Sequence, residues 1–357
     1  MIRQLSLNRS TAVLFVLFLL ARHAIPITAT AQTQPIVTAL AHDSVSSRTI
    51  RLEPIDGLTA PVVVTAAASD PRGEWLAVAG DDHAIRILDV ATLRVTHTLK
   101  GHRDMIRTLA FNSAGTSLVS AGNDGQLIVW GRARSFEMIQ QMQDTPALAC
   151  VCFAPGISEM AAVGFDRKVY ILGRPVDQTP QFSCDCNDLR AVAYRDDRKV
   201  IAVGGRSGDL HLFDPASGNL IVDKHLHDGR IRDIAFHRDA NSVVSVGEDG
   251  KVIVFDTETQ RVLQQLQVTS GRLFAITVID SQHVAVAGSD NTIRIVNTDE
   301  GAISHTLEGH VGSISTLTAT AGMLFSGGFD ATLRRWSIQE WNRSERRIAD
   351  GDIRIDR

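Results

Sequence analysis

The sequence predicts an all-β fold, a closed ring of seven repeated units that each contain four short antiparallel strands. Three observations lead to this prediction. One turn pattern recurs along the chain at intervals of 40 to 42 residues, and a short alternating apolar run follows every copy. In addition, a strand-like segment before the first unit matches a strand that the last unit lacks. Repeats of about 41 residues are typical of the four-stranded blades of a β-propeller.

The turn pattern is clearest at residues 120–130, SAGNDGQLIVW, and at residues 326–336, SGGFDATLRRW, which start 206 residues apart. An anchor residue, usually Asp, recurs in seven places, and a Gly stands two residues before each anchor. The anchors are Asp82, Asp124, Asp166, Ser207, Asp249, Asp290 and Asp330. The run after each anchor alternates apolar and other residues with period two, which predicts a strand that follows a tight turn.

Four strands are expected in each unit, as the runs MIRTLAF, SLVSAG, QLIVW and SFEMIQQM show for residues 105–142. The seventh unit has only three, because the sequence after residue 337 becomes a charged segment without a strand pattern. Residues 49–53 are similar to the outer-strand segment LRVTHTLKGH of a later unit. We therefore expect them to complete the seventh blade, which closes the ring and removes an exposed sheet edge.

These repeats resemble those of the WD-repeat β-propeller family, whose units often begin with Gly-His and end in a Trp-Asp-like pair. The resemblance covers residues 49–338. It is degenerate at the Trp position, which holds Leu88, Trp130, Leu172, Phe213, Phe255, Val296 and Trp336. The resemblance implies a non-catalytic scaffold that binds a protein or peptide. The alternative is an exported propeller enzyme or small-ligand-binding protein, which would need a convergent polar or metal site in the channel.

The N-terminal 31 residues have the three regions of a secretory signal peptide. Arg3 and Arg9 precede the apolar run TAVLFVLFLLA, and Ala29-Thr30-Ala31 suits cleavage before Gln32. The apolar run is short for a membrane span, and an uncleaved anchor is the alternative. We therefore expect an exported protein, periplasmic or secreted, with a linker at 32–48, the propeller at 49–338 and a charged, flexible tail at 339–357.

Composition narrows the range of partners. The 357-residue chain has a net charge of −4, which becomes −7 without the predicted leader because the leader holds three Arg and no acid. This acidity argues against a nucleic-acid partner. We expect a monomeric propeller without stable membrane insertion after cleavage. The chain contains no P-loop and no His-Glu-x-x-His motif, so neither a cofactor nor a metal ion is expected.

The four cysteines leave their chemistry open. Cys150 and Cys152 lie two residues apart on an expected inner strand, which places their Cα atoms nearly 7 Å apart and too far for a mutual disulfide. Cys184 and Cys186 lie near the outer strand of the third blade. Disulfides, free buried thiols and a metal site all remain open for this set.

Three units combine a His, a Ser and an Asp, which are the residue types of a hydrolase triad. An enzyme needs one nucleophile, however, whereas this set recurs at the period of the repeat. The resemblance implies a structural His, Ser, Asp and Trp tetrad instead. Its members are His102, Ser120, Asp124 and Trp130; His227, Ser245 and Asp249, with Phe255 at the Trp position; and His310, Ser326, Asp330 and Trp336.

A partner-binding site is expected at the mouth of the channel. The resemblance implies that the loop before each inner strand and the turn before each anchor open on one face. The residues at these positions are Met105, Arg107, Asp188, Arg190, Arg230, Arg232, Arg272 and Phe274, together with Phe165, Arg206 and Phe329. Six Arg with exposed aromatics predict an acidic peptide or other anion as the partner. The alternative is that each Arg pairs with a nearby acid such as Asp188, Asp228 or Asp233.

Overall fold

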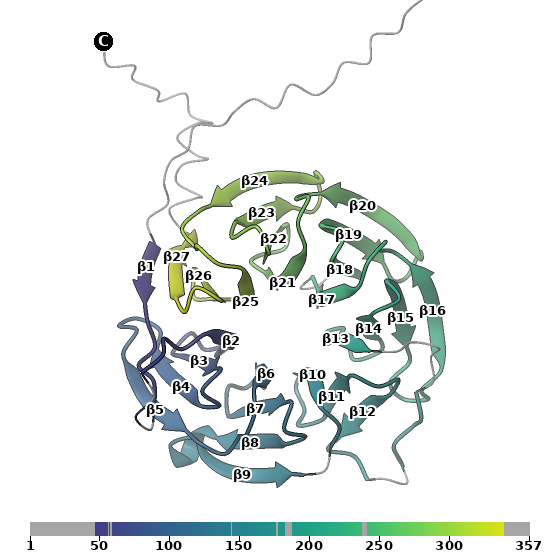
Figure 1. Cartoon of the computed structure of the whole chain (residues 1–357). Helices are drawn as coiled ribbons and strands as arrows, with labels where there is room; N and C mark the ends of the chain where they lie inside the picture. The colour runs from purple at the N-terminus through teal and green to yellow at the C-terminus, as the bar shows by residue number, and fades with distance from the viewer. Residues whose placement is uncertain are drawn as a thin grey trace, which may run out of the picture. The chain divides into compact units, whose positions relative to one another are not determined.

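The computed structural model describes residues 47–338 except 56, 58, 144, 176, 177, 183–187 and 238–240. Within these residues, seven antiparallel sheets surround a central opening (Figure 1). The predicted seven-bladed propeller is therefore confirmed. The predicted signal peptide, the predicted tail and nearly all of the predicted linker lie outside the described residues. Within the described part of the chain, no helix has the length and apolar character that crossing a membrane requires.

Each sheet is one blade, and its strands follow one another outward from the channel (Figure 1). Blade 1 contains β2 (Val64–Ser69), β3 (Trp75–Gly80), β4 (Ile85–Asp89) and β5 (Val95–Leu99). Blade 2 contains β6 (Ile106–Phe111), β7 (Ser117–Gly122), β8 (Leu127–Gly131) and β9 (Glu137–Met142), with the 3-10 helix η1 (Arg132–Arg134) between the last two. The described part of blade 3 contains β10 (Leu148–Phe153), β11 (Met160–Gly164) and β12 (Val169–Leu172).

Blades 4 to 6 each have four strands. Blade 4 contains β13 (Leu189–Tyr194), β14 (Ile201–Gly205), β15 (Asp209–Phe213) and β16 (Leu220–His225). Blade 5 contains β17 (Ile231–Phe236), β18 (Ser242–Gly247), β19 (Lys251–Asp256) and β20 (Arg261–Gln267). Blade 6 contains β21 (Leu273–Val278), β22 (His283–Gly288), β23 (Ile293–Asn297) and β24 (Ala302–Leu307).

Blade 7 joins the two ends of the ring. Its strands are β25 (Ile314–Thr320), β26 (Met323–Gly328), β27 (Leu333–Ser337) and β1 (Ser47–Ile50), and β1 pairs antiparallel with β27. The predicted closure is confirmed, but the closing strand lies at Ser47–Ile50 rather than at residues 49–53. Glu53 lies beyond the strand, and its carbonyl oxygen accepts a hydrogen bond from Arg86 Nη2 at 2.7 Å.

The hydrophobic core lies between neighbouring blades, because the two faces of each twisted sheet pack on the sheets beside it. The middle strands β3, β7, β14 and β18 are almost entirely buried. A representative cluster joins blades 1 and 2 and includes Ala77, Ile85, Leu99, Ile106, Leu118, Ile128 and Trp130. The outer strands alternate exposed and buried residues or are mostly exposed, since one of their edges meets solvent.

The Gly that precedes each anchor has a steric reason. A Cβ atom on Gly122 would lie 2.2 Å from the Met105 carbonyl oxygen, and one on Gly288 would lie 1.8 Å from the Arg272 carbonyl oxygen. The residue after the Gly donates its N–H to that carbonyl, as Asn123 does to Met105 at 3.0 Å. The same hydrogen bond forms in all seven blades, so it attaches each anchor turn to the loop before the inner strand.

Every inner strand carries a one-residue β-bulge at its second residue, an element that the repeat pattern alone did not predict. The bulged residues are Thr65, Arg107, Ala149, Arg190, Arg232, Phe274 and Ser315. A bulge leaves its residue out of the pairing and redirects its side chain. These seven side chains therefore occupy equivalent places around one end of the channel.

Candidate functional site

Blade 2 brings His102, Ser120, Asp124 and Trp130 into one hydrogen-bonded network. His102 Nδ1 lies 2.9 Å from Asp124 Oδ2, and His102 Nε2 lies 2.8 Å from Ser120 Oγ. The Trp130 indole N–H donates to the same Ser120 hydroxyl at 2.9 Å. The network therefore connects the loop before β6 with β7, with the anchor turn and with β8.

Blade 7 repeats this arrangement. His310 Nδ1 lies 2.9 Å from Asp330 Oδ2, and His310 Nε2 lies 2.7 Å from Ser326 Oγ. The Trp336 indole N–H donates to Ser326 Oγ at 2.9 Å. Thr332 adds a second hydroxyl, which donates to Asp330 Oδ1 at 2.7 Å.

Blade 5 forms the network without the indole. His227 lies 2.9 Å from Asp249 through Nδ1 and 2.8 Å from Ser245 through Nε2, whereas Phe255 occupies the Trp position. The structure thus brings together all three sets of residues that the sequence singled out.

The burial of these networks favours a structural role over catalysis. Ser120 and Ser326 have no exposed surface, so neither hydroxyl can reach a substrate. Burial lowers the pKa of His102 and of His310, although the neighbouring Asp124 and Asp330 act in the opposite direction. Both imidazoles are therefore neutral near pH 7, with each ring nitrogen engaged by a partner. The structural role remains a prediction that stability measurements can test.

In three blades without this His, the anchor Asp has a different partner, four residues further along the chain. Arg86 donates to Asp82 in blade 1, and Tyr170 donates to Asp166 in blade 3. In blade 6, Arg294 lies 2.7 Å from Asp290. The sequence interpretation missed these pairs. The signal was a basic or phenolic residue at the fourth place after the anchor.

Arginine and phenylalanine side chains meet at the channel mouth over blades 2 to 6. We define the arginine arc as Arg107, Phe165, Arg190, Arg230, Arg232 and Phe274. The Arg190 guanidinium carbon lies 4.1 Å from the centre of the Phe165 ring, and that of Arg107 lies 5.9 Å from the same ring. The Arg232 guanidinium carbon lies 5.2 Å from the centre of the Phe274 ring. Cation–π contacts of this kind hold guanidinium groups in defined places.

Two acidic side chains lie among the four arginines of the arc. Asp188 accepts ion pairs from Arg190 at 2.7 Å and from Arg230 at 2.8 Å. Glu248 lies 3.2 Å from Arg230 and 3.5 Å from Arg232. Three arginines therefore share two carboxylates, and Arg107 donates instead to the Asn123 amide oxygen, which leaves the arc with an excess of positive charge.

The electrostatics of the arc reflect this excess. Burial lowers the pKa of Arg190, and the nearby Arg230, Arg232 and Arg107 lower it further against the opposing effect of Asp188. The Nε atoms of Arg190, Arg230 and Arg232 are buried and have no hydrogen-bond partner within the described part of the chain. An added anion would relieve the like-charge repulsion.

The other predicted partner-binding residues lie outside this cluster. Met105 is half-buried, whereas Arg206 and Arg272 are exposed and form no ion pair with a residue that the structure describes. Phe329 is 59% exposed on the anchor turn of blade 7. The cation–π contacts of the arc involve Phe165 and Phe274, so Phe329 is not part of the arginine arc.

The pairing of each Arg with a nearby acid, which the sequence left open, holds only in part. Of the three acids considered, Asp188 does pair with arginines of the arc. Asp228 instead accepts a hydrogen bond from Lys251 at 2.5 Å. Asp233 accepts the backbone N–H groups of Ile234 and Ile276. Glu248, which was not anticipated, takes the place of these two acids.

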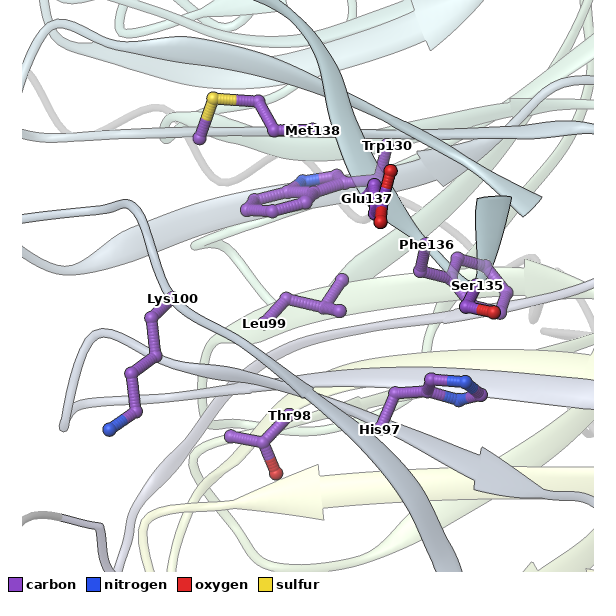
Figure 2. A pocket seen from close by; sticks show the side chains of 9 residues that line it. All are labelled: His97, Thr98, Leu99, Lys100, Trp130, Ser135, Phe136, Glu137 and Met138. Carbon is purple, nitrogen blue, oxygen red and sulfur yellow. The ribbon is translucent and has the colours of Figure 1, made fainter. Parts of the chain in front are cut away.

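A separate groove of about 360 Å³ lies at the outer edge of the ring, between β5 of blade 1 and the η1–β9 region of blade 2. Figure 2 shows the side chains of Leu99, Trp130 and Phe136 along it, with His97 and Lys100 on the β5 side. Trp130 also belongs to the blade 2 network, and Phe136 contacts Trp75 edge to face. The groove is therefore a junction between two blades.

Cys150 and Cys152 on β10 are free thiols. This agrees with the prediction that their spacing is too wide for a disulfide between the two. Burial raises the pKa of the Cys150 thiol to about 12, so this side chain stays protonated at neutral pH. The Cys150 thiol lies 3.8 Å from the Val192 carbonyl oxygen of the next blade. Cys184 and Cys186 lie outside the described residues.

Comparisons with known proteins bear on this geometry. The family model "WD domain, G-beta repeat" matches residues 53–89, 93–131, 219–256 and 301–337. The last three segments contain the three His–Ser–Asp networks. Each matched segment ends with the third strand of a blade, so in the later segments the repeat unit begins with the outer strand of the preceding blade.

Individual relatives are distant. The chain is 23% identical to "Autophagy-related protein 16" of Arabidopsis thaliana over 63% of this chain and 45% of that protein. It is 24% identical to "WD repeat-containing protein 55" of Bos taurus over 64% of this chain and 62% of that protein. The chain thus spans less than two thirds of the length of these curated relatives.

A solved structure has the same fold. The "Crystal structure of Myceliophteria_thermophila Cps50 (Swd1) beta-propeller domain" superposes with a TM-score of 0.70 and 17% sequence identity, covering 82% of this chain and 99% of that one. The chain is therefore a seven-bladed β-propeller, and four of its segments are similar to the WD40 repeat.

Proposed function

We propose that this chain is a non-catalytic scaffold that acts outside the cytoplasm and binds an acidic segment of a partner protein at the arginine arc. The observation that carries the proposal is the convergence of Arg190, Arg230 and Arg232 on the carboxylates of Asp188 and Glu248 at the channel mouth. WD40 repeats support a role in protein interaction. The propeller is proposed to work as a monomer.

The chemistry of the arc suits carboxylates. A guanidinium group can donate two parallel N–H bonds to one carboxylate, and the arc brings four such groups to one end of the channel. Phe165 is 40% exposed and fixes two of the four guanidinium groups by stacking. Preformed donors lower the entropic cost of binding, because the side chains already have fixed positions.

The test is a triple variant in which Arg190, Arg230 and Arg232 are replaced by Ala. A labelled poly-glutamate peptide serves as the probe, and binding is followed by fluorescence anisotropy at several salt concentrations. The variant should bind at least about tenfold more weakly, since three charge-assisted contacts are lost. Binding to the unmodified chain should weaken and its association should slow as salt rises.

A matched control replaces the exposed Arg72, Arg94 and Arg261 by Ala, which removes the same charge away from the channel mouth. This control should bind the peptide about as well as the unmodified chain. Equal loss in both triple variants would mean that net charge alone drives binding, and unchanged affinity in the first variant would place the docking site elsewhere.

Location needs a separate test, because the proposal of export rests on residues 1–31 alone. These residues, fused to a reporter enzyme that becomes active only after export, should yield active enzyme. Replacing Leu17 by Arg in the apolar run should abolish this activity, since a charge there is incompatible with signal recognition. An inactive reporter in the fusion with the unmodified residues 1–31 would contradict export.

A further inference from the structure

The outer strand pair of blade 4 carries a repeated Asp-x-His sequence that the propeller fold does not require. Strand β15 contains Asp209 and His211, and strand β16 contains Asp223 and His225. The two strands are antiparallel, with Asp209 opposite His225 and His211 opposite Asp223. Residues two apart on a strand share a face, and directly paired residues share that face too. All four side chains therefore lie on one face of the blade.

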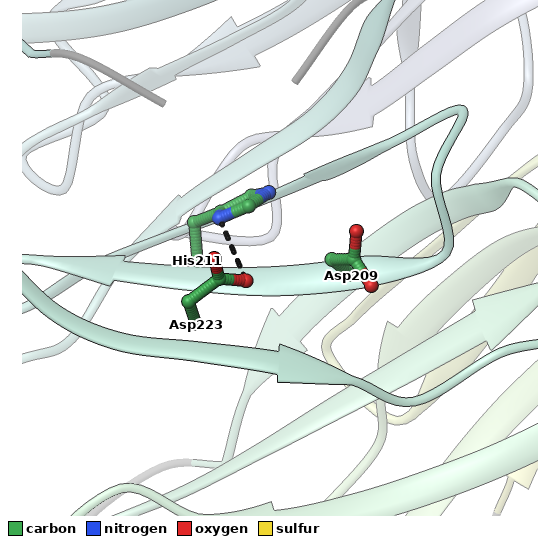
Figure 3. A group of neighbouring side chains, drawn as sticks. All are labelled: Asp209, His211 and Asp223. Atoms are coloured by element: carbon green, nitrogen blue, oxygen red, sulfur yellow. Dashed lines mark ion pairs between the residues drawn. The ribbon is translucent and has the colours of Figure 1, made fainter. Parts of the chain in front are cut away.

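Figure 3 shows His211 and Asp223 facing each other, with Asp209 beside them on the strand of His211. The possible ligand atoms of Asp209, His211 and Asp223 all lie within 4.8 Å of one another. His211 Nδ1 lies 3.5 Å from Asp223 Oδ1. His225 adjoins the group, since its Nδ1 lies 2.7 Å from Asp209 Oδ1.

His211 is the residue that points to a ligand. Its side chain is only 4% exposed, yet neither of its ring nitrogens has a hydrogen-bond partner within the described part of the chain. Buried polar groups are nearly always paired, as His102 and His310 are through both of their nitrogens. A neutral imidazole has one ring nitrogen with a free lone pair, which can bind a metal ion.

We propose that Asp209, His211 and Asp223 bind a divalent transition-metal ion such as Zn²⁺, with His225 as a fourth ligand when it leaves Asp209. Imidazole nitrogen together with carboxylate oxygen is a donor set that suits zinc, whereas calcium and magnesium prefer oxygen alone. Two carboxylates balance the two charges of the ion. The site is independent of the arginine arc and of the partner proposed there.

The geometry requires a small closure around the ion. Zinc binds such ligands at about 2.0 to 2.2 Å, so two of its ligands lie at most about 4.4 Å apart. The present spread of up to 4.8 Å can shorten through rotation of Asp223, whose side chain is 60% exposed. The same exposure provides the path by which an ion enters. The buried His211 is the fixed ligand.

The experiment uses the full chain, purified without a poly-histidine tag and treated with a chelator, and titrates it with zinc chloride in a calorimeter. We expect one zinc ion per chain and a rise in melting temperature with added zinc. Asp223→Asn should weaken zinc binding by about tenfold or more, since it removes a charged ligand. The substitution is at an exposed side chain, so unfolding of the zinc-free variant should match that of the unmodified chain.

Asp280→Asn is the matched control, because it disrupts another surface Asp–His pair, in which Asp280 lies 3.0 Å from His283. It should leave zinc binding unchanged. Cobalt, used in place of zinc, reports the donor atoms through its absorption spectrum, in which thiolate ligands add a charge-transfer band. Absence of stoichiometric zinc, equal affinity in Asp223→Asn and Asp280→Asn, or a thiolate band that Asp223→Asn leaves unchanged would each overturn the proposal.

Discussion

Blade 2 and blade 4 have the same repeat, but different side chains stabilise their anchor turns. Blade 2 has the complete network around Asp124. Blade 4 has Ser207 as its anchor, and the Ser207 hydroxyl accepts only the Asp209 N–H, at 3.3 Å. Blade 4 also has Val203 at the Ser position and Phe213 at the Trp position, and both are fully buried. Even so, blade 4 forms four strands with the same bulge.

The comparison shows that the polar network is not needed to form a blade. Apolar burial can replace the Ser and Trp pair, since removing both members of a hydrogen bond leaves no unpaired group. Removing one member is different, because the remaining buried partners lose their hydrogen bonds. The blades should therefore respond very differently to single substitutions at equivalent positions.

The largest effect is expected from single truncations in blade 2. Ser120→Ala, His102→Ala or Asp124→Asn should each lower the free energy of unfolding by about 1 to 3 kcal/mol, because each leaves buried polar atoms unpaired. Thermal and denaturant unfolding measure this change. The matched substitution in blade 4, Ser207→Ala, should change stability by less than about 0.5 kcal/mol, since Ser207 is exposed. An unchanged melting temperature in all three blade 2 variants, or a lost activity at unchanged stability, would contradict a structural role for the network.

A smaller effect is expected from pH. The pKa of His102 and of His310 is lower in the folded chain than the ordinary value of 6.5, chiefly through burial. As pH falls through about 6.5, the unfolded chain binds protons that the folded chain does not, so stability decreases. The His102→Ala variant, though less stable at neutral pH, should lose less stability between about pH 7 and 5 than the unmodified chain. Parallel curves for the two proteins, from unfolding at several pH values, would contradict this assignment.

The smallest effect is expected from giving blade 4 the usual anchor. Ser207→Asp can accept the Asp209 N–H as the other anchors accept equivalent groups, for example Lys168 N–H to Asp166 at 3.1 Å. Without a buried Ser and Trp at the other positions, the new carboxylate completes no network. Stability should therefore change by less than about 0.5 kcal/mol, measured by denaturant unfolding. A gain of more than about 1 kcal/mol would show that the anchor alone stabilises the turn.

The fold and the networks could be predicted because both recur at the spacing of the repeat unit. Asp124 and Asp330 stand in the same place of their units, so one rule finds both. The ring closure was also predictable, although Ser47–Ile50 begins two residues earlier than expected, since a strand end depends on hydrogen bonds that periodicity does not encode.

The residues that were missed break the repeat. Arg86 and Tyr170 pair with their anchors in blades that lack the His, and the residue type at this position changes from blade to blade. Glu248 meets Arg230 and Arg232 across a bulge whose position the sequence does not reveal. The group formed by His211 and Asp223 depends on the exact pairing of two strands, and a shift of one residue would separate them.

The pairing of β1 with β27 also has a consequence for the order of folding. Ser47 and Arg334, which share a hydrogen bond across this pair, are 287 residues apart in the chain. At synthesis rates of about 5 to 20 residues per second, the first strand exists on the order of 15 to 60 s before its partner. During that interval the strand is an unpaired edge that can associate with other chains. The pairing of β1 with β27 therefore forms only when the whole propeller has been made. A factor that shields β1 would aid folding most before β27 is synthesised.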